Sequence, residues 1–250
     1  MSNLLLIILF ALGSYLFGNI NWAILISKYK KTDIRKLGSG NPGTLNMSRN
    51  LGLKAGLLTF FLDIMKGATP VLIAFFVMRG KVFVGTDFLV VDFAVFLCGL
   101  CAVLGHIYPV FFKFKGGKGI ASTIGVFLVC SSVFGWEWAV VAIMALVAAG
   151  VFIYFTEFGA MGSFIAITPP AIGNAIRLYL TYNSTSNLTS YTFYIITNVL
   201  IFAICLFTWC AHRNNIKRML AGDEHPTSIK EMVVKMKLKK AQEKNAQKDN

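Results

Sequence analysis

The chain alternates between long apolar runs and short polar connections. A helix needs about 20 consecutive, mainly apolar residues to cross the hydrocarbon core of a bilayer. By this criterion we expect membrane spans at 4–26, 55–78, 88–108, 120–135, 138–155, 162–180 and 191–211. The fourth and fifth runs are short and nearly continuous, so five or six spans are the alternatives to seven. The pattern predicts an all-α polytopic membrane protein.

Lysine and arginine are concentrated in alternate connections. The first connection carries Lys28, Lys30, Lys31, Arg35, Lys36, Arg49 and Lys54. The third carries Lys113, Lys115 and Lys118. Because basic residues are retained in cytoplasmic loops, we expect both connections to lie in the cytoplasm. With seven spans, the N-terminus is then outside the membrane and the C-terminus inside.

The composition agrees with the membrane class. Hydrophobic residues make up 56% and charged residues 14% of the 250 positions, which excludes an ordinary soluble protein. We expect one integral membrane domain at 1–225 and a basic cytoplasmic tail at 226–250, with a solvated helix as the alternative for the tail. The formal net charge of +13 favours anionic inner-leaflet lipid as a partner over nucleic acid.

Nothing in the sequence calls for a metal or a cofactor. All five cysteines lie in apolar runs, and the pair at Cys98 and Cys101 has no histidine or second pair at metal-binding spacing. We therefore expect buried, inert thiols. The first apolar run resembles the core of a signal peptide, but it lacks a basic leader and continues to Ile26, so we expect an uncleaved span.

The first basic connection contains the glycine-rich segment GSGNPG at 38–43. It matches the dinucleotide fingerprint G-x-G-x-x-G, but that motif requires a preceding strand in a βαβ unit, and the acid at the expected distance, Asp63, lies within a span. We therefore reject nucleotide binding. Clustered glycines still permit close approach of an anion, with Ser39, Asn41 and Asn46 as donors and Arg49 as a bidentate one. An ordinary tight turn is the alternative.

The third connection contains KGGKG at 115–119. It is not a nucleotide-binding P-loop, because Phe112 replaces the first glycine and Gly119 replaces the metal-binding hydroxyl. Consecutive glycines beside a lysine can hold a phosphate through unshielded amide N–H groups, whereas a plain basic loop would not need them. His106 precedes this loop and is a further candidate, with a simple interfacial histidine as its alternative.

Two pairs of polar residues lie one helical turn apart. His212 and Asn215 share a helix face directly after the last span, which a purely anchoring basic helix does not explain. Asp63 and Lys66 lie within the second span, where ionisable residues are functional candidates by default, although a structural ion pair is an equal alternative.

Together these segments resemble the three motifs of the bacterial acyl-phosphate:glycerol-3-phosphate acyltransferases. The first is GSGNPG, the second is GHIYP at 105–109 with FKGGKG at 114–119, and the third runs from HRNNIKR to residue 224. Their order and spacing match across roughly 30–225, and the segment DIMKG at 63–67 is also similar to that family.

The resemblance implies transfer of a fatty acyl group from acyl phosphate to the 1-hydroxyl of sn-glycerol 3-phosphate, in the bacterial inner membrane. The products are lysophosphatidic acid and phosphate, in the first acylation of phospholipid synthesis. With no convincing nucleophile in the sequence, we expect no covalent acyl-enzyme, and we expect a monomer. The residues assigned to catalysis are Ser39, Asn46, Arg49, Lys118, His212 and Asn215. Those assigned to substrate binding are Gly38, Gly40, Asn41, Gly43, His106, Gly116, Gly117, Gly119, Ser122 and Glu224.

The sequence departs from the family pattern in two places. Leu45 and Ser122 stand where threonine is usual, and Leu45 removes one hydroxyl from the first motif. The competing function is a membrane transporter of phosphate or of a phosphorylated lipid precursor. Inverted repeats or helices broken at matching positions in two halves would favour it, and we find neither in the sequence.

Overall fold

The structure is a computed structural model, and it describes residues 3–223, 227, 234 and 238. The candidate residue Glu224 and most of the expected basic tail lie outside the described residues. Within the described part, the chain is helical apart from turns and connections, which confirms the predicted all-α class. The elements are α1 (Asn3–Gly18), α2 (Trp22–Tyr29), η1 (Ile34–Lys36), α3 (Thr44–Leu51), α4 (Leu53–Met78), α5 (Val90–Ile107), η2 (Val110–Phe112), α6 (Ile120–Phe134), α7 (Trp136–Thr156), α8 (Gly159–Tyr182), α9 (Leu188–Ala211) and α10 (Arg213–Leu220).

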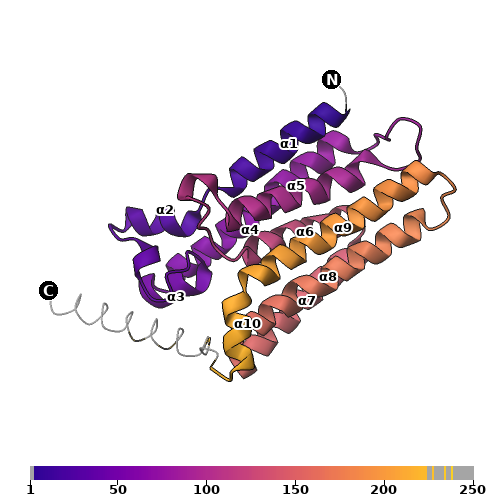
Figure 1. Cartoon of the computed structure of the whole chain (residues 1–250). Coiled ribbons are helices and arrows are strands. Elements are labelled where there is room, and N and C mark those ends of the chain that lie inside the picture. The colour runs from indigo at the N-terminus through magenta and orange to yellow at the C-terminus, as the bar shows by residue number, and fades with distance from the viewer. Residues whose placement is uncertain (1–2, 224–226, 228–233, 235–237, 239–250) are drawn as a thin grey trace.

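Seven long helices correspond to the seven expected spans and form one elongated bundle (Figure 1). Five segments of the described chain are both long and apolar enough to cross a membrane. They are Asn3–Tyr29, Leu53–Met78, Val90–Phe112, Trp136–Thr156 and Leu188–Ala211. Of the other two helices, α6 is apolar but only 15 residues long, and α8 has 24 residues with a more polar composition.

Several polar residues of α6 and α8 face other helices. Thr123 on α6 shares a hydrogen bond of 3.0 Å with Thr208 on α9, and the Asn174 amide on α8 donates to the Ser131 hydroxyl on α6 at 3.0 Å. All four side chains are buried. Because hydrocarbon offers no hydrogen-bond partner, a helix covered by its neighbours can carry polar residues that a lipid-facing helix cannot.

The first expected span, 4–26, is not one continuous helix. The helix α1 ends at Gly18, and α2 begins at Trp22. The side chain of Asn21 caps α2 by accepting a hydrogen bond from the Ile24 amide at 3.1 Å. Hydropathy alone does not register this break because the residues around it are mostly apolar, whereas asparagine before a helix supplies the acceptor that the first turn lacks.

Glycines bring two pairs of helices into backbone contact. A Cβ atom added at Gly105 of α5 would lie 2.2 Å from the Tyr15 carbonyl oxygen of α1, and one at Gly125 of α6 would lie 2.1 Å from the Ile64 carbonyl oxygen of α4. Neither position can hold a side chain without moving the backbone. Small residues at such crossings let membrane helices pack closely where the hydrophobic effect contributes little.

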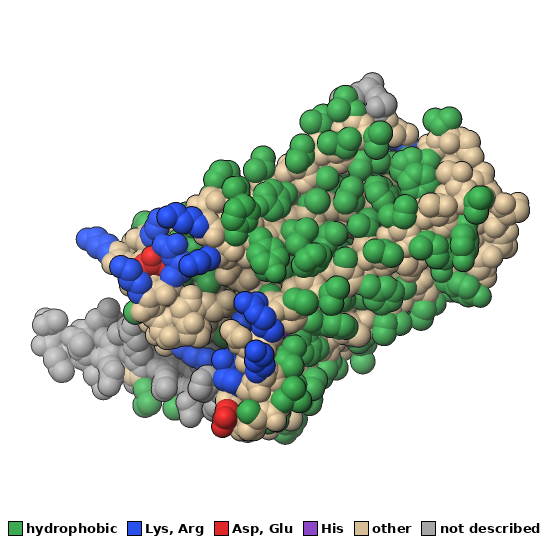
Figure 2. Space-filling model, viewed as in Figure 1, with side chains coloured by type: hydrophobic (Ala, Val, Ile, Leu, Met, Phe, Trp, Pro, Cys, Tyr) green, Lys and Arg blue, Asp and Glu red, His purple; other side chains and the backbone are tan. Residues whose placement is uncertain are grey.

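Basic and hydrophobic side chains occupy different parts of the surface of the bundle. Figure 2 shows lysine and arginine side chains gathered at the end that carries α2, α3 and α10, opposite the N-terminus, while hydrophobic side chains cover the flank. Exposed apolar residues along the long helices include Leu12, Phe61, Ile73, Met144, Val151 and Phe202. An apolar flank with a basic end is the surface expected of a protein embedded in a bilayer.

A buried ion pair joins α5 to α8 at the far end of the bundle. The Arg177 guanidinium lies 2.7 Å from Asp92, whose second oxygen accepts a hydrogen bond from the Tyr182 hydroxyl at 2.6 Å. The guanidinium also lies over the Phe134 ring, 3.8 Å from its centroid. Pairing of this kind is what allows two charged side chains to remain inside a membrane protein.

Candidate active site

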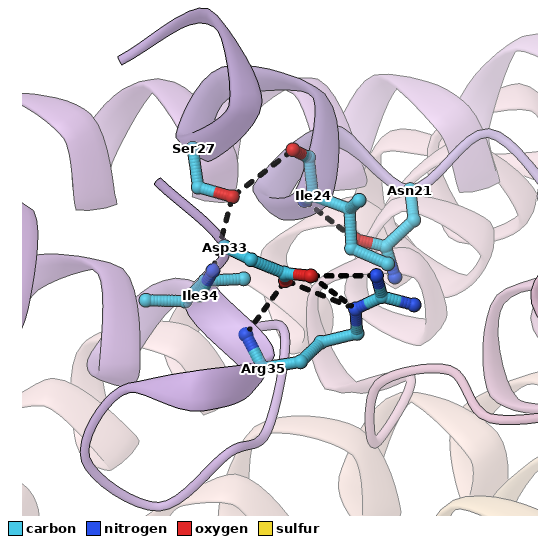
Figure 3. A network of polar contacts seen from close by, with 6 residues as sticks. All are labelled: Asn21, Ile24, Ser27, Asp33, Ile34 and Arg35. Carbon is cyan, nitrogen blue, oxygen red and sulfur yellow. Dashed lines mark hydrogen bonds and ion pairs between the residues drawn. The ribbon is translucent and has the colours of Figure 1, made fainter. Parts of the chain in front are cut away.

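The segment before the first glycine-rich loop is held by the polar contacts drawn in Figure 3. The Ser27 hydroxyl of α2 donates to the Ile24 carbonyl at 3.0 Å and accepts the Ile34 amide at 3.2 Å. Asp33 pairs with the Arg35 guanidinium at 2.6 Å, and this hydrogen bond lowers the pKa of Asp33 to about 2. Arg35, although exposed, is thereby held by Asp33 beside the loop.

Asn46, on the first turn of α3, organises the glycine-rich loop. Its side-chain oxygen accepts the Ser39 amide at 3.2 Å, while its amide group donates to the carbonyls of Ile34 at 3.2 Å and Leu37 at 3.0 Å. The side chain is buried. Gly38 has a positive φ of +53° and leaves no room for a Cβ beside Asn46. The contacts of Asn46 therefore hold the loop that presents Ser39.

The second loop folds back onto the C-terminal end of α5. The amides of Gly116 and Gly117 donate to the carbonyls of Ile107 and His106 at 3.1 and 3.2 Å. A Cβ at Gly116 would lie 1.9 Å from the His106 carbonyl oxygen. The consecutive glycines predict amides that face a phosphate. In the structure they satisfy carbonyls that a helix end leaves unpaired, and glycine is required here for close approach to α5. The same contact positions Lys118.

His212 and Asn215 bring the third motif to this loop. The His212 ring is buried, and its Nδ1 lies 2.8 Å from the Thr208 carbonyl oxygen. Since a carbonyl only accepts, Nδ1 carries the proton and Nε2 holds the lone pair. Burial, assisted by the Lys118 charge, lowers the pKa of His212 to about 4, so the ring is neutral near pH 7. The Asn215 side-chain oxygen accepts a hydrogen bond from the Lys118 ammonium.

The three motifs surround two adjoining cavities, one lined mainly by apolar side chains and the other by cationic ones. The first, of about 350 Å³, has a polar end at the motifs and an apolar body between α4, α6, α7 and α8. Its apolar body is lined by Phe60, Ile124, Leu146, Ala149, Ile153 and Ala166. We call it the apolar cavity. It has the lining expected for a hydrocarbon chain.

The second cavity, of about 540 Å³, lies at the basic end of the bundle. No acidic residue of the described chain lines this cavity. Five cationic side chains do: Arg35, Lys115, Lys118, Arg213 and Arg218. We call it the cationic cavity. The two cavities share Ser39, Asn41, Lys118, Asn215 and Arg218. A small polyanion bound in the cationic cavity would therefore meet the polar end of the apolar cavity at these residues.

A family model described as glycerol-3-phosphate acyltransferase matches residues 8–222. The chain belongs to this family. A glycerol-3-phosphate acyltransferase of Mycoplasmopsis pulmonis is 36% identical over 216 residues, covering 86% of this chain and 90% of the relative. A second, of Aquifex aeolicus, is 37% identical over 228 residues, covering 88% and 97%.

Solved structures of an integral membrane glycerol 3-phosphate acyltransferase, PlsY (YgiH), share the fold. Its glycerol 3-phosphate form has a TM-score of 0.65 and 32% identity, and its lysophosphatidic acid form has a TM-score of 0.68 and 30% identity. Each comparison covers 91% of this chain and 98% of the other. The chain is thus a multi-pass membrane acyltransferase, which decides against the transporter alternative.

The fold brings together most of the residues that the sequence singled out. All six side chains expected to act in catalysis line the apolar cavity, together with Asn41, Gly43, His106 and Gly119. Gly40, Gly116 and Gly117 line the cationic cavity. Gly38 and Ser122 are in neither lining within the described chain; Ser122 is buried, with its hydroxyl 3.4 Å from His106 Nδ1. The individual roles of these residues stay predictions.

Arg218 and Thr227 are among the lining residues that the motifs did not predict. Arg218 lies one turn beyond Asn215 on α10 and lines both cavities, and that helical spacing was a signal that could have identified it. Thr227 lies beyond the family match, and no motif marks it. Its side chain accepts a hydrogen bond from Arg49 at 3.3 Å, and its amide donates to the Glu157 carbonyl at 2.8 Å.

Proposed function

We propose that this acyltransferase moves a fatty acyl group from acyl phosphate to the 1-hydroxyl of sn-glycerol 3-phosphate, giving lysophosphatidic acid and phosphate. The observation that carries the proposal is the meeting of the apolar and cationic cavities at Ser39, Lys118 and Asn215. Two substrates, one with a fatty chain and one a small polyanion, would bring their reacting groups together at that junction. The glycerol 3-phosphate form of the solved relative supports the choice of acceptor.

An acyl phosphate suits the apolar cavity along its whole length. Its hydrocarbon chain matches the body of the cavity, and its phosphate matches the cationic side chains at the polar end, Arg49, Lys118 and Arg218. Such a mixed anhydride is already activated. The enzyme then has to align the acceptor hydroxyl and to stabilise the charge that develops on the departing phosphate.

The transfer needs one bond to form and one to break. The 1-hydroxyl oxygen attacks the acyl carbonyl carbon, and the bond from that carbon to the phosphate oxygen breaks. The hydroxyl proton passes to the departing phosphate or to Nε2 of His212, which is neutral and holds its lone pair there. Ser39 acts as a hydrogen-bond donor in this scheme, so no acyl-enzyme forms.

The setting that suits this chemistry is the bacterial inner membrane. The basic end of the bundle would face the cytoplasm and the anionic lipid of the inner leaflet, with the N-terminus outside and the C-terminus inside. We further propose that the enzyme acts as a monomer.

The test uses purified protein in lipid nanodiscs with palmitoyl phosphate, with and without glycerol 3-phosphate. We expect release of phosphate and appearance of lysophosphatidic acid by mass spectrometry only when both substrates are present. The variant Lys118→Met should lose most of this activity, whereas Lys217→Met, an exposed lysine that lines neither cavity, should retain it. Product formation from palmitoyl-CoA but not from palmitoyl phosphate would refute the proposed donor.

Direct transfer is tested separately with radiolabelled palmitoyl phosphate and no acceptor. We expect no label on the washed, denatured protein. Stable label on the wild-type chain that is released into lysophosphatidic acid when glycerol 3-phosphate is added would refute the mechanism without a covalent intermediate.

A further inference from the structure

Asp63 and Lys66 form a fully buried ion pair on α4. Asp63 Oδ1 lies 2.9 Å from Lys66 Nζ, and the two side chains are 3% and 0% exposed. Both belong to a helix that is long and apolar enough to cross the membrane. Charges in such a place are costly unless each is paired, and they mark functional positions more often than neutral residues do.

The lysine end of this pair contacts the break in the first span. Lys66 Nζ donates a hydrogen bond to the Ile20 carbonyl at 2.8 Å, between the end of α1 at Gly18 and the start of α2 at Trp22. The carbonyls at the end of a helix lack helical partners. The Lys66 ammonium is therefore held between the Asp63 carboxylate and the Ile20 carbonyl. These contacts also fix the position of the Asp63 carboxylate.

The aspartate end faces His106 on α5. The same Oδ1 atom lies 3.7 Å from His106 Nδ1, and both side chains line the polar end of the apolar cavity. The opposite edge of the ring faces the second loop, because a Cβ added at Gly117 would lie 2.3 Å from His106 Nε2. The imidazole is thus confined between a carboxylate on one side and the loop on the other.

The loop is bound to the backbone of the same histidine. The Gly117 amide donates to the His106 carbonyl at 3.2 Å, and the next residue is Lys118, whose ammonium donates to Asn215. A rotation of the His106 ring or a shift of its backbone would therefore displace the lysine shared by the two cavities. The contacts form one continuous path from Ile20 through α4 to this lysine.

We propose that Asp63, held by Lys66, is a positioning residue that acts through His106 to fix the second loop for glycerol 3-phosphate. This inference rests on the proposed function, since it takes the cationic cavity as the acceptor site. Asp63 touches neither substrate in this scheme. Its removal should weaken acceptor binding at Lys118 and leave the body of the apolar cavity unchanged.

The test compares two buried ion pairs in the same protein. The variant Asp63→Asn/Lys66→Met removes both charges of one pair, so that no unpaired charge remains in the core. The variant Asp92→Asn/Arg177→Met does the same to the pair at the far end of the bundle, which lines neither cavity. Both are purified in nanodiscs, and thermal unfolding reports how far each loses stability.

We expect Asp63→Asn/Lys66→Met to raise KM for glycerol 3-phosphate at least tenfold and KM for palmitoyl phosphate by less, because Arg49 and Arg218 remain to hold the donor phosphate. Asp92→Asn/Arg177→Met should lower the unfolding temperature without raising KM for glycerol 3-phosphate. A purely structural role for Asp63 would give both variants the same kinetic pattern, and that result would overturn the inference.

Two further measurements keep the test decisive. In Gly117→Ala, the added methyl group presses on the His106 ring from the side of the second loop. This variant should selectively raise KM for glycerol 3-phosphate, and it serves as the test if the double variant yields no folded protein. An unchanged KM for glycerol 3-phosphate would overturn the inference. Calorimetric binding of glycerol 3-phosphate needs no acyl donor. It therefore separates a failure of the positioning role, seen as unchanged affinity in the variants, from a failure of the proposed acyl-phosphate chemistry.

Discussion

The ammonium of Lys118 donates a hydrogen bond to the side-chain oxygen of Asn215, 97 residues further along the chain. The contact joins the second motif to the third at the place where the apolar and cationic cavities meet. Since asparagine carries no charge, this contact orients the ammonium without placing a negative charge beside it.

This relationship predicts strongly non-additive kinetics. Lys118→Met and Asn215→Leu should each lower kcat/KM for glycerol 3-phosphate by about 10- to 100-fold, the range of a hydrogen bond to a charged group. The double variant should be no more than about threefold worse than Lys118→Met, because the asparagine acts through the lysine. Steady-state kinetics on the four proteins check this, and losses that simply multiply would contradict it.

The buried His212 predicts a dependence of stability on pH. Its pKa falls from an ordinary value near 6.5 to about 4 in the folded protein, mainly through burial. Between these two values the unfolded chain binds more protons. Stability is therefore complete above about pH 6.5 and declines as the pH falls toward 4, by at most about 1.4 kcal/mol per pH unit.

Thermal unfolding in detergent from pH 4 to 8 measures this effect. The comparison is with His212→Gln, whose amide group can donate to the Thr208 carbonyl but does not titrate. The stability of the wild type relative to this variant should rise steadily above pH 4 and become constant above pH 7. Parallel curves over the whole range would mean that His212 is not held neutral by the fold.

The close helix crossings predict intolerance of even one methyl group. Gly125→Ala should destabilise the bundle by about 1–3 kcal/mol, because its Cβ would meet the Ile64 carbonyl of α4. Gly13→Ala on α1 is the matched control, since nothing lies within 4 Å of its added Cβ. It should leave the unfolding temperature unchanged or raise it slightly. Equal effects of the two variants would argue against backbone contact between α4 and α6.

The contact between Thr227 and Arg49 predicts a contribution from residues beyond the family match. Thr227→Val keeps the shape of the side chain but removes one acceptor of the Arg49 guanidinium, and it should lower kcat/KM by about three- to tenfold. Thr227→Ser, which keeps the hydroxyl, should remain within twofold of wild type. Equal values of kcat/KM for the serine and valine variants would show that the hydrogen bond from Arg49 to the Thr227 hydroxyl does not contribute to activity.

The helical framework could be predicted because hydropathy reports directly on lipid contact. The expected spans 55–78, 120–135 and 191–211 agree with Leu53–Met78, Ile120–Phe134 and Leu188–Ala211 to within three residues. The break after Gly18 was missed because it depends on a cap at Asn21 and on the buried Lys66, and neither interrupts the apolar run. Hydropathy likewise does not show that polar residues of α8 are buried by contacts with other helices.

The site could be located from its motifs, but the geometry of each residue could not. Glycine at 116 and 117 suggested amides facing an anion, whereas both amides bind the end of α5. The assignment of Asn46 to catalysis stays a prediction, but the sequence did not show that its hydrogen bonds organise the loop that carries Ser39. In both cases the missing information was a partner distant in sequence, which residue type and local spacing do not encode.

The apolar cavity has α7 as one wall, and most of that helix faces outward. Leu146, Ala149 and Ile153 line the cavity, while Met144 and Val151 lie on the exposed side. In the proposed scheme, a single helix therefore separates the fatty chain of the donor from the surrounding leaflet. A fatty donor that enters past it never leaves the two-dimensional phase in which it is dissolved. The donor concentration that governs turnover is then its mole fraction in the bilayer. Diluting the membrane with inert lipid should therefore slow the enzyme, while adding buffer at a constant, saturating concentration of glycerol 3-phosphate should not.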